Sequence, residues 1–185
     1  VTASSFDNSV ISGHTALAAT PADTDEFLIS DAGTIKRIDY SYIKSANTPA
    51  FQANTTTDAT VNISNQSLTK VTFATEVFDT DSKFTDSRFT PTISGKYYVF
   101  TRLSFNTATD FDDLRLHFYK NGSRYSGAVG RSEYYQQIYL YDIIDFDTDD
   151  YVEVYAYQDS GGTVSILTNE DGRRNCFGAF KIIGA

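Results

Sequence analysis

Short strand-like segments separated by polar turns fill the sequence from Pro49 to Ala185, and this pattern limits the fold more than any other feature. The dipeptides Asn121-Gly122 and Gly161-Gly162 are typical of tight β-turns. No stretch of this region has the 3.6-residue apolar spacing of a helix. About ten short strands with this punctuation predict an all-β sandwich. We expect strands at residues 49–53, 61–64, 68–75, 89–92, 96–106, 114–120, 136–146, 151–158, 163–168 and 177–184.

Several of these segments carry large apolar side chains on both faces. In segment 96–106, Tyr97 and Leu103 share the first face, because side chains alternate along a strand. The second faces of this segment, of 136–146 and of 151–158 carry Tyr98, Phe100, Tyr139, Tyr141, Tyr155 and Tyr157. Either these aromatic residues are amphipathic surface residues, or a partner molecule covers them, because a large exposed apolar patch favours association.

The charge balance limits the partners. The net charge is −9 and the isoelectric point is about 4.5, which argues against nucleic acid and anionic membranes as partners. No apolar run approaches the ~18 residues of a membrane span, so we expect no membrane insertion. The single cysteine, Cys176, cannot form an intramolecular disulfide, and we expect it to be buried and inert.

The sequence offers little for catalysis. Its two histidines are His14, in a polar N-terminal arm, and His117, which we expect on the surface of strand 114–120. A catalytic triad needs a convergent histidine, nucleophile and carboxylate, and nothing here predicts one. We therefore expect no enzyme. A polysaccharide hydrolase that uses two of the many aspartates is an alternative.

An acidic segment places Asp145, Asp147 and Asp149 at alternate positions. Several carboxylate oxygens on a tight loop could bind calcium, but the glycine and the closing glutamate of an EF-hand are missing. Two interpretations stay open, namely a calcium site and a solvated acidic loop without metal. We expect no other cofactor.

Three motifs resemble the C1q/TNF-like head domain, whose sequences carry F-x-x-P-x-x-G-x-Y-x-F, L-x-x-G-D-x-V-x-V and F-x-G-F. They are Phe89-x-Pro91-(x)3-Gly95-Lys96-Tyr97-Tyr98-Val99-Phe100, Asp150-Tyr151-Val152-Glu153-Val154 and Phe177-Gly178-Ala179-Phe180. The opening Pro49-Ala50-Phe51 is also similar. Asp149 stands where the family has glycine, and no collagen repeat is present.

This resemblance implies a jelly-roll β-sandwich of about ten strands over residues 49–185. It also implies a homotrimer, with Tyr98, Phe100, Tyr139, Tyr141, Tyr155 and Tyr157 at the three-fold interface. Gly95 and Gly178 are expected to be structural, at places where the backbone turns or approaches a neighbour closely.

Residues 1–48 form a separate segment, an arm followed by a hairpin with strands at 27–30 and 35–40 around the turn 31–34. The stretch from Ala18 to Lys44 resembles a short module in structural proteins of marine tailed phages. This second resemblance implies that residues 1–48 form a stalk or attach to other virion proteins. A lone hairpin is marginal in water and needs such contacts.

Together these features predict a non-enzymatic, trimeric structural or adhesion protein of a tailed-phage virion, such as a fibre, knob or decoration protein. The alternative is a secreted C1q-like binding module of a cellular organism. Strands are committed to packing, so we expect loop 122–135 to contact a host surface glycan or protein. Its candidate ligand residues are Arg124, Tyr125, Arg131, Tyr134 and Tyr135, because Tyr and Arg concentrate binding energy.

Overall fold

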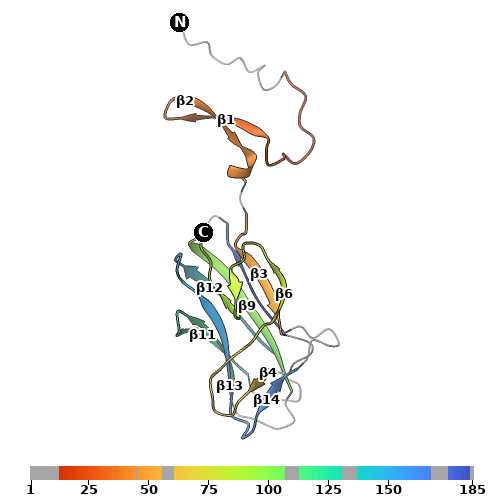
Figure 1. The fold of residues 1–185 in the computed structure, drawn as a ribbon, viewed down its shortest axis with the longest axis vertical. Coiled ribbons are helices and arrows are strands. Elements are labelled where there is room, and N and C mark those ends of the chain that lie inside the picture. The colour runs from red at the N-terminus through yellow and green to blue at the C-terminus, as the bar shows by residue number, and fades with distance from the viewer. Residues whose placement is uncertain are drawn as a thin grey trace. The chain divides into compact units, whose positions relative to one another are not determined.

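The computed structural model describes residues 13–44, 46–55, 61–106, 113–130, 137–167 and 175–183. The chain divides into two compact units, Val1–Ser45 and Ala46–Ala185. The first contains a small hairpin, and the second contains two packed sheets (Figure 1). In the described ranges, no helix is long and apolar enough to cross a membrane.

The first unit has one antiparallel hairpin, β1 (Glu26–Asp31) and β2 (Thr34–Asp39), followed by the 3₁₀ helix η1 (Tyr40–Tyr42). Ala32 and Gly33 connect the strands with φ angles of 48° and 82°. Positive φ at both positions is what a two-residue hairpin turn requires. Apolar side chains such as Leu28 and Ile35 remain exposed, so the hairpin buries little surface of its own.

The second unit is a sandwich of two antiparallel sheets. The β10 sheet has the order β11-β10-β13-β8-β7, and β5 also pairs with β13. Its strands are β5 (Thr69–Lys70), β7 (Phe84–Thr85), β8 (Arg88–Phe89), β10 (Leu114–Lys120), β11 (Ser123–Gly130) and β13 (Val152–Gln158).

The second layer is the β9 sheet, with the order β4-β14-β9-β15-β3-β6, in which β12 also pairs with β9. Its strands are β3 (Ala50–Asn54), β4 (Val61–Ile63), β6 (Thr75–Asp79), β9 (Gly95–Asn106), β12 (Gln137–Phe146), β14 (Val164–Ile166) and β15 (Cys176–Lys181). Neighbouring strands in both sheets are often distant in sequence, as the crossing connections of a jelly roll require (Figure 1).

The core between the sheets is rich in phenylalanine. Phe51 on β3 stacks on Phe84 and Phe89, with ring centroids 4.5 and 4.6 Å away, and meets Phe177 edge-on at 4.9 Å. Tyr97 is fully buried, and its hydroxyl donates to the Ile93 carbonyl at 2.7 Å. Residues of the sequence motifs thus supply much of the core. Within a strand, these core residues lie at every second position.

The predicted division of β9 into two faces is confirmed. Tyr97, Val99 and Leu103 are buried in the core, whereas Tyr98 and Phe100 lie on the outer face and are only partly buried. β12 follows the same rule. The prediction that Cys176 is buried is also confirmed.

Other details of the sequence prediction were wrong. Residues 123–130 were expected to be part of a loop but form the edge strand β11, which pairs with β10 along its whole length. Its core-facing side chains are small, as Ala128 shows, so the apolar alternation that marks a half-buried strand is absent. Of the expected strand 68–75, only Thr69–Lys70 pairs with β13, and Thr75 already begins β6.

Candidate functional site

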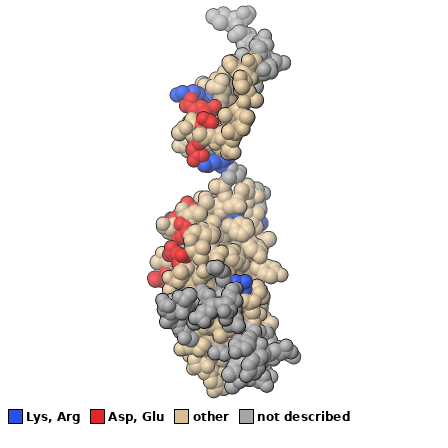
Figure 2. Space-filling model, turned by 90° about the vertical axis from the view of Figure 1, so that its right-hand side faces the viewer, with Lys and Arg blue, Asp and Glu red and all other residues tan. Residues whose placement is uncertain are grey.

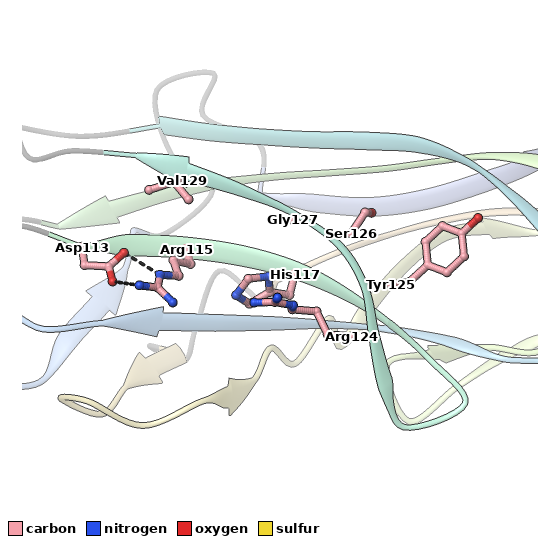
Figure 3. A pocket seen from close by; sticks show the side chains of 8 residues that line it. All are labelled: Asp113, Arg115, His117, Arg124, Tyr125, Ser126, Gly127 and Val129. Atoms are coloured by element: carbon pink, nitrogen blue, oxygen red, sulfur yellow. Dashed lines mark hydrogen bonds and ion pairs between the residues drawn. The ribbon is translucent and has the colours of Figure 1, made fainter.

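The outer face of β10 and β11 carries a hollow of about 570 Å³ (Figure 3). It is lined by Asp113, Arg115 and His117 from the β10 side and by Arg124, Tyr125, Ser126, Gly127 and Val129 from β11. We call it the β10–β11 hollow. Two of the five predicted ligand residues, Arg124 and Tyr125, therefore lie together, although on a strand. The other three, Arg131, Tyr134 and Tyr135, lie outside the described residues.

One end of the hollow is held by an ion pair. The Asp113 carboxylate accepts a hydrogen bond of 2.7 Å from Arg115 Nε and a second from Nη2 (Figure 3). The guanidinium of Arg115 also lies over the ring of Tyr157, 5.3 Å from its centroid. This arrangement fixes Arg115 in place and balances its charge.

His117 was expected on the surface, and this prediction was wrong. The side chain points away from the core but is only 6% exposed, because β11 runs beside it. Its partner in the strand register is Gly127, and a Cβ on Gly127 would overlap the imidazole ring. Glycine at this position therefore lets the ring lie against the neighbouring backbone.

The buried imidazole is electrostatically constrained. Burial lowers the pKa of His117 below its ordinary value, and the nearby positive charges of Arg124 and Arg115 lower it further. The hydrogen bond to the Ser126 backbone and the charge of Asp113 oppose this shift without cancelling it. The ring is therefore neutral at pH 7, and its Nδ1 atom has no hydrogen-bond partner among the described residues.

A second surface lies on the outer face of the β9 sheet. We call it the aromatic patch, and it consists of Tyr98, Phe100, Tyr139, Tyr141, Ile143 and Phe180. The ring of Tyr98 lies 6.0 Å from Phe100, 6.3 Å from Tyr141 and 5.4 Å from Phe180. Tyr141 is 66% exposed, so the patch has no cover within the described chain.

The six residues predicted for the trimer interface do not share one surface. Tyr98, Phe100, Tyr139 and Tyr141 belong to the aromatic patch, whereas Tyr155 and Tyr157 lie on the outer face of the β10 sheet. Tyr155 packs against Tyr119, with ring centroids 4.5 Å apart, and Tyr157 contacts Arg115. Sequence alternation shows which face of a strand a residue occupies, but not which sheet the strand joins.

The β10 sheet also holds an ionised glutamate. Glu153 is 3% exposed and accepts hydrogen bonds from Lys70 at 2.7 Å and Arg88 at 2.9 Å. Burial would raise its pKa, but the bonds from the two cations outweigh that effect, and the pKa is lowered. Arg88 in turn lies over the ring of Tyr151, 4.0 Å from its centroid. This cluster stabilises the sheet and keeps the Glu153 carboxylate buried and paired.

The acidic segment with Asp145, Asp147 and Asp149 lies on the surface. Asp145 pairs with Lys96 at 2.9 Å, and Asp147 donates its backbone N–H to Asp150 at 2.8 Å. Asp149 is exposed. Hydrogen bonds from Lys120 and from the Asp147 backbone hold the pKa of Asp150 at about 2. Within the described ranges, no three His, Cys, Asp or Glu side chains form a metal-binding group.

Acidic side chains gather along one side of the second unit, and few basic ones share that face (Figure 2). The β10–β11 hollow brings together two arginines, Arg115 and Arg124. Sequence reasoning missed His117, Arg115 and Asp113 as members of the site. The available signal was their i, i+2 spacing on the outer face of strand 114–120, next to the hairpin turn at Asn121-Gly122.

No protein-family model matches the sequence. A search of curated proteins finds no match either. Among solved structures, the chain is similar to the globular domain of zebrafish complement 1qA protein, with a TM-score of 0.51 and 15% identity over 72% of this chain and 97% of that one. It is also similar to Eiger TNF from S. frugiperda, with a TM-score of 0.57 and 12% identity over 74% of this chain and 93% of that one. The fold is therefore a C1q/TNF-like jelly roll, as the sequence motifs predicted.

Proposed function

We propose that this chain is the protomer of a non-enzymatic, homotrimeric binding head. The aromatic patch carries this proposal. Four exposed or half-buried aromatic rings from β9, β12 and β15 adjoin one another there, and each aromatic side chain presents roughly 150–250 Å² for burial. A patch of this size on a soluble domain marks an association surface. The resemblance of the sequence motifs to C1q/TNF-like heads implies three copies.

The aromatic patch suits contact with other copies more than with a small ligand. Its rings lie on the flat outer face of a sheet, and the shallow groove among them is lined mainly by apolar surface. Tyr141 and Ile143 point outward from β12, which pairs with one edge of β9. Burial of such side chains contributes on the order of 1.5–3 kcal/mol each.

The variant Tyr141→Asp tests this part of the proposal. Tyr141 is exposed in the single chain, so the substitution leaves the fold intact but places an unpaired charge in the buried interface. Light scattering should then give the mass of one chain, 20.5 kDa, with an unchanged circular dichroism spectrum. The matched control is Tyr125→Asp on the other sheet, which should leave the assembly intact. Unchanged assembly of Tyr141→Asp would contradict the proposed interface.

The finer proposal places this head on the particle of a tailed phage. The resemblance of the stretch from Ala18 to Lys44 to a phage module supports it, and the exposed apolar side chains of the β1–β2 hairpin suit attachment to another virion protein. In this arrangement the second unit faces outward and contacts a host surface through the β10–β11 hollow. Electron microscopy with a gold-labelled antibody against residues 49–185 should mark one place on the virion. Particles without label would overturn the virion role.

A second candidate is a secreted C1q-like binding module of a cellular organism. The observation that favours it is the fold likeness to a fish complement protein and an insect TNF. The two candidates share the trimeric binding head and differ in where it is displayed. The gene's neighbours decide between them, because capsid and tail genes beside it are expected only for the virion protein.

We further propose that the head has no catalytic role. Glu153 is buried and held by two cations, so it is not placed to transfer a proton to or from a bound substrate. The pKa of His117 is lowered by burial and by two neighbouring arginines, which opposes the protonated form that a general acid needs. Hydrolysis of a polysaccharide panel by the purified protein, lost on replacement of one aspartate, would refute this.

A further inference from the structure

The β10–β11 hollow carries a net positive charge within an acidic protein. Arg115 and Arg124 each contribute one positive charge, Asp113 contributes one negative charge, and the imidazole of His117 is neutral. The lining residues alone therefore sum to one positive charge. Asp159 also acts on Arg115, and its carboxylate accepts a hydrogen bond from the backbone N–H of Asp113, so the positive charge that stays without a nearby partner is that of Arg124. A single negative charge would balance it.

Arg124 is the group that is free to bind such a charge. Asp113 occupies two N–H groups of Arg115, whereas no ion pair of Arg124 is found within the described ranges. The Arg124 side chain is exposed, and its charge faces the imidazole of His117 (Figure 3). A free guanidinium presents two parallel N–H groups, which match the two oxygens of a carboxylate.

An unsatisfied polar atom also lies at the hollow. The Nδ1 atom of His117 is buried and has no hydrogen-bond partner among the described residues. Buried polar atoms are nearly always paired, so this exception points to a ligand that supplies the partner. A ligand with several hydroxyl groups can do so, because a hydroxyl both donates and accepts.

The space and the rim of the hollow suit a sugar. Its volume of about 570 Å³ lies within the usual range for small-molecule sites. Gly127 contributes no side chain to fill it, and Tyr125 on the same strand is exposed and presents an aromatic ring. Aromatic rings pack well against apolar faces with polar edges, and a pyranose ring has both.

We propose that the β10–β11 hollow binds an acidic saccharide, in which Arg124 holds one carboxylate and Tyr125 packs against the sugar ring that carries it. The edge of His117 hydrogen-bonds to one of its hydroxyl groups. A singly charged carboxylate matches the single excess positive charge better than a doubly charged phosphate. This inference rests on the proposed role of the chain as a binding head and names the class of ligand for it.

Histidine NMR provides a direct test on the full chain. The sequence has two histidines, His14 and His117, so a protein labelled with ¹³C at histidine Cε1 gives two signals. Addition of trigalacturonic acid should shift the His117 signal and raise the pKa of that ring, because the carboxylate offsets the neighbouring arginine charges. The His14 signal, from the other unit, should stay in place. The methyl ester of the same trisaccharide, which lacks the charge, should cause no comparable shift.

Two variants locate the carboxylate. Arg124→Gln should weaken trigalacturonate binding by about tenfold or more, the loss expected for a charge-assisted hydrogen bond. Arg37→Gln makes the same change on the exposed β2 strand and should leave the affinity unchanged. Equal affinities for both variants and the unchanged protein would overturn the role of Arg124.

Other results would overturn the ligand class. If the His117 chemical shift does not change at millimolar trigalacturonate, or changes equally with the methyl ester, the ligand is not an acidic saccharide. Equal affinity for inorganic phosphate would indicate a simple anion site, and tighter binding of a glutamate-rich peptide would indicate a protein ligand. The mass of the same samples separates two failures. A trimer that does not bind the sugar refutes this inference alone, whereas a monomer refutes the proposed function.

Discussion

The ring of Phe100 on β9 lies over Gly178 on β15, in the space that a Cβ of residue 178 would occupy. The two residues are direct partners in the strand register. The same relationship recurs in the other sheet between His117 and Gly127. In each case a glycine lets a large outer ring lie close to the backbone of the neighbouring strand, where it contributes to a surface that we assign to binding.

Substitution of Gly178 should therefore destabilise the fold. In Gly178→Val, the new side chain would collide with Phe100 and would approach the backbone oxygen of Phe51, which lies 2.9 Å from the Cβ position. We expect a loss of about 1–3 kcal/mol in the free energy of unfolding. Urea denaturation measures this loss, and the double variant with Phe100→Ala should recover part of it. A stability equal to that of the unchanged protein would contradict the close packing.

The stability of the protein should fall in mild acid because of His117. Its pKa is lowered in the folded state, so the unfolded chain binds the proton more tightly. The contribution of the neutral ring is complete above the ordinary histidine pKa of about 6.5 and is lost as the pH falls through the folded pKa. Urea denaturation between pH 8 and pH 5 should show this decline.

The variant His117→Gln serves as the control for this pH dependence, because glutamine does not titrate. The slope of stability against pH between pH 6.5 and pH 5 should be smaller for the variant than for the unchanged protein. Parallel curves would show that another group causes the decline.

Glu153 should be essential for the β10 sheet. Glu153→Gln removes the charge that neutralises Lys70 and Arg88, which are themselves partly exposed to solvent, so we expect a loss of about 1.5–3 kcal/mol from the charged hydrogen bonds. Asp145→Asn is the matched control, because its pair with Lys96 is exposed on both sides and such pairs contribute about 0–1 kcal/mol. Thermal melting of both variants gives the comparison. Equal effects on melting would mean that the buried cluster is not a stabilising element.

The sequence predicts the sandwich and much of its core, for a definite physical reason. Successive side chains of β9 and β12 point to opposite faces, and both faces carry large apolar groups. The motif residues Phe89, Tyr97 and Phe177 fill the space between the sheets. These features depend on strand periodicity and on local motifs, which a single sequence contains. The structural neighbours confirm the jelly roll that the motifs imply.

The candidate site was only partly predictable, because it depends on which strands become neighbours. Arg124 and Tyr125 were predicted as ligand residues because of their residue type. The segment that forms β11 was interpreted as a loop, because its residues do not alternate between apolar and polar. His117 is buried because β11 and β13 pair with β10 on either side of it. Tyr155 could not be separated from Tyr98 for the same reason, since sheet membership is a long-range property.

The mass of the unchanged 185-residue chain in solution tests the central claim most directly. Sedimentation equilibrium or light scattering at micromolar concentration should give about three times the protomer mass of 20.5 kDa, because we propose that neighbouring copies cover the aromatic patch. A folded, stable monomer of 20.5 kDa under the same conditions would contradict the account.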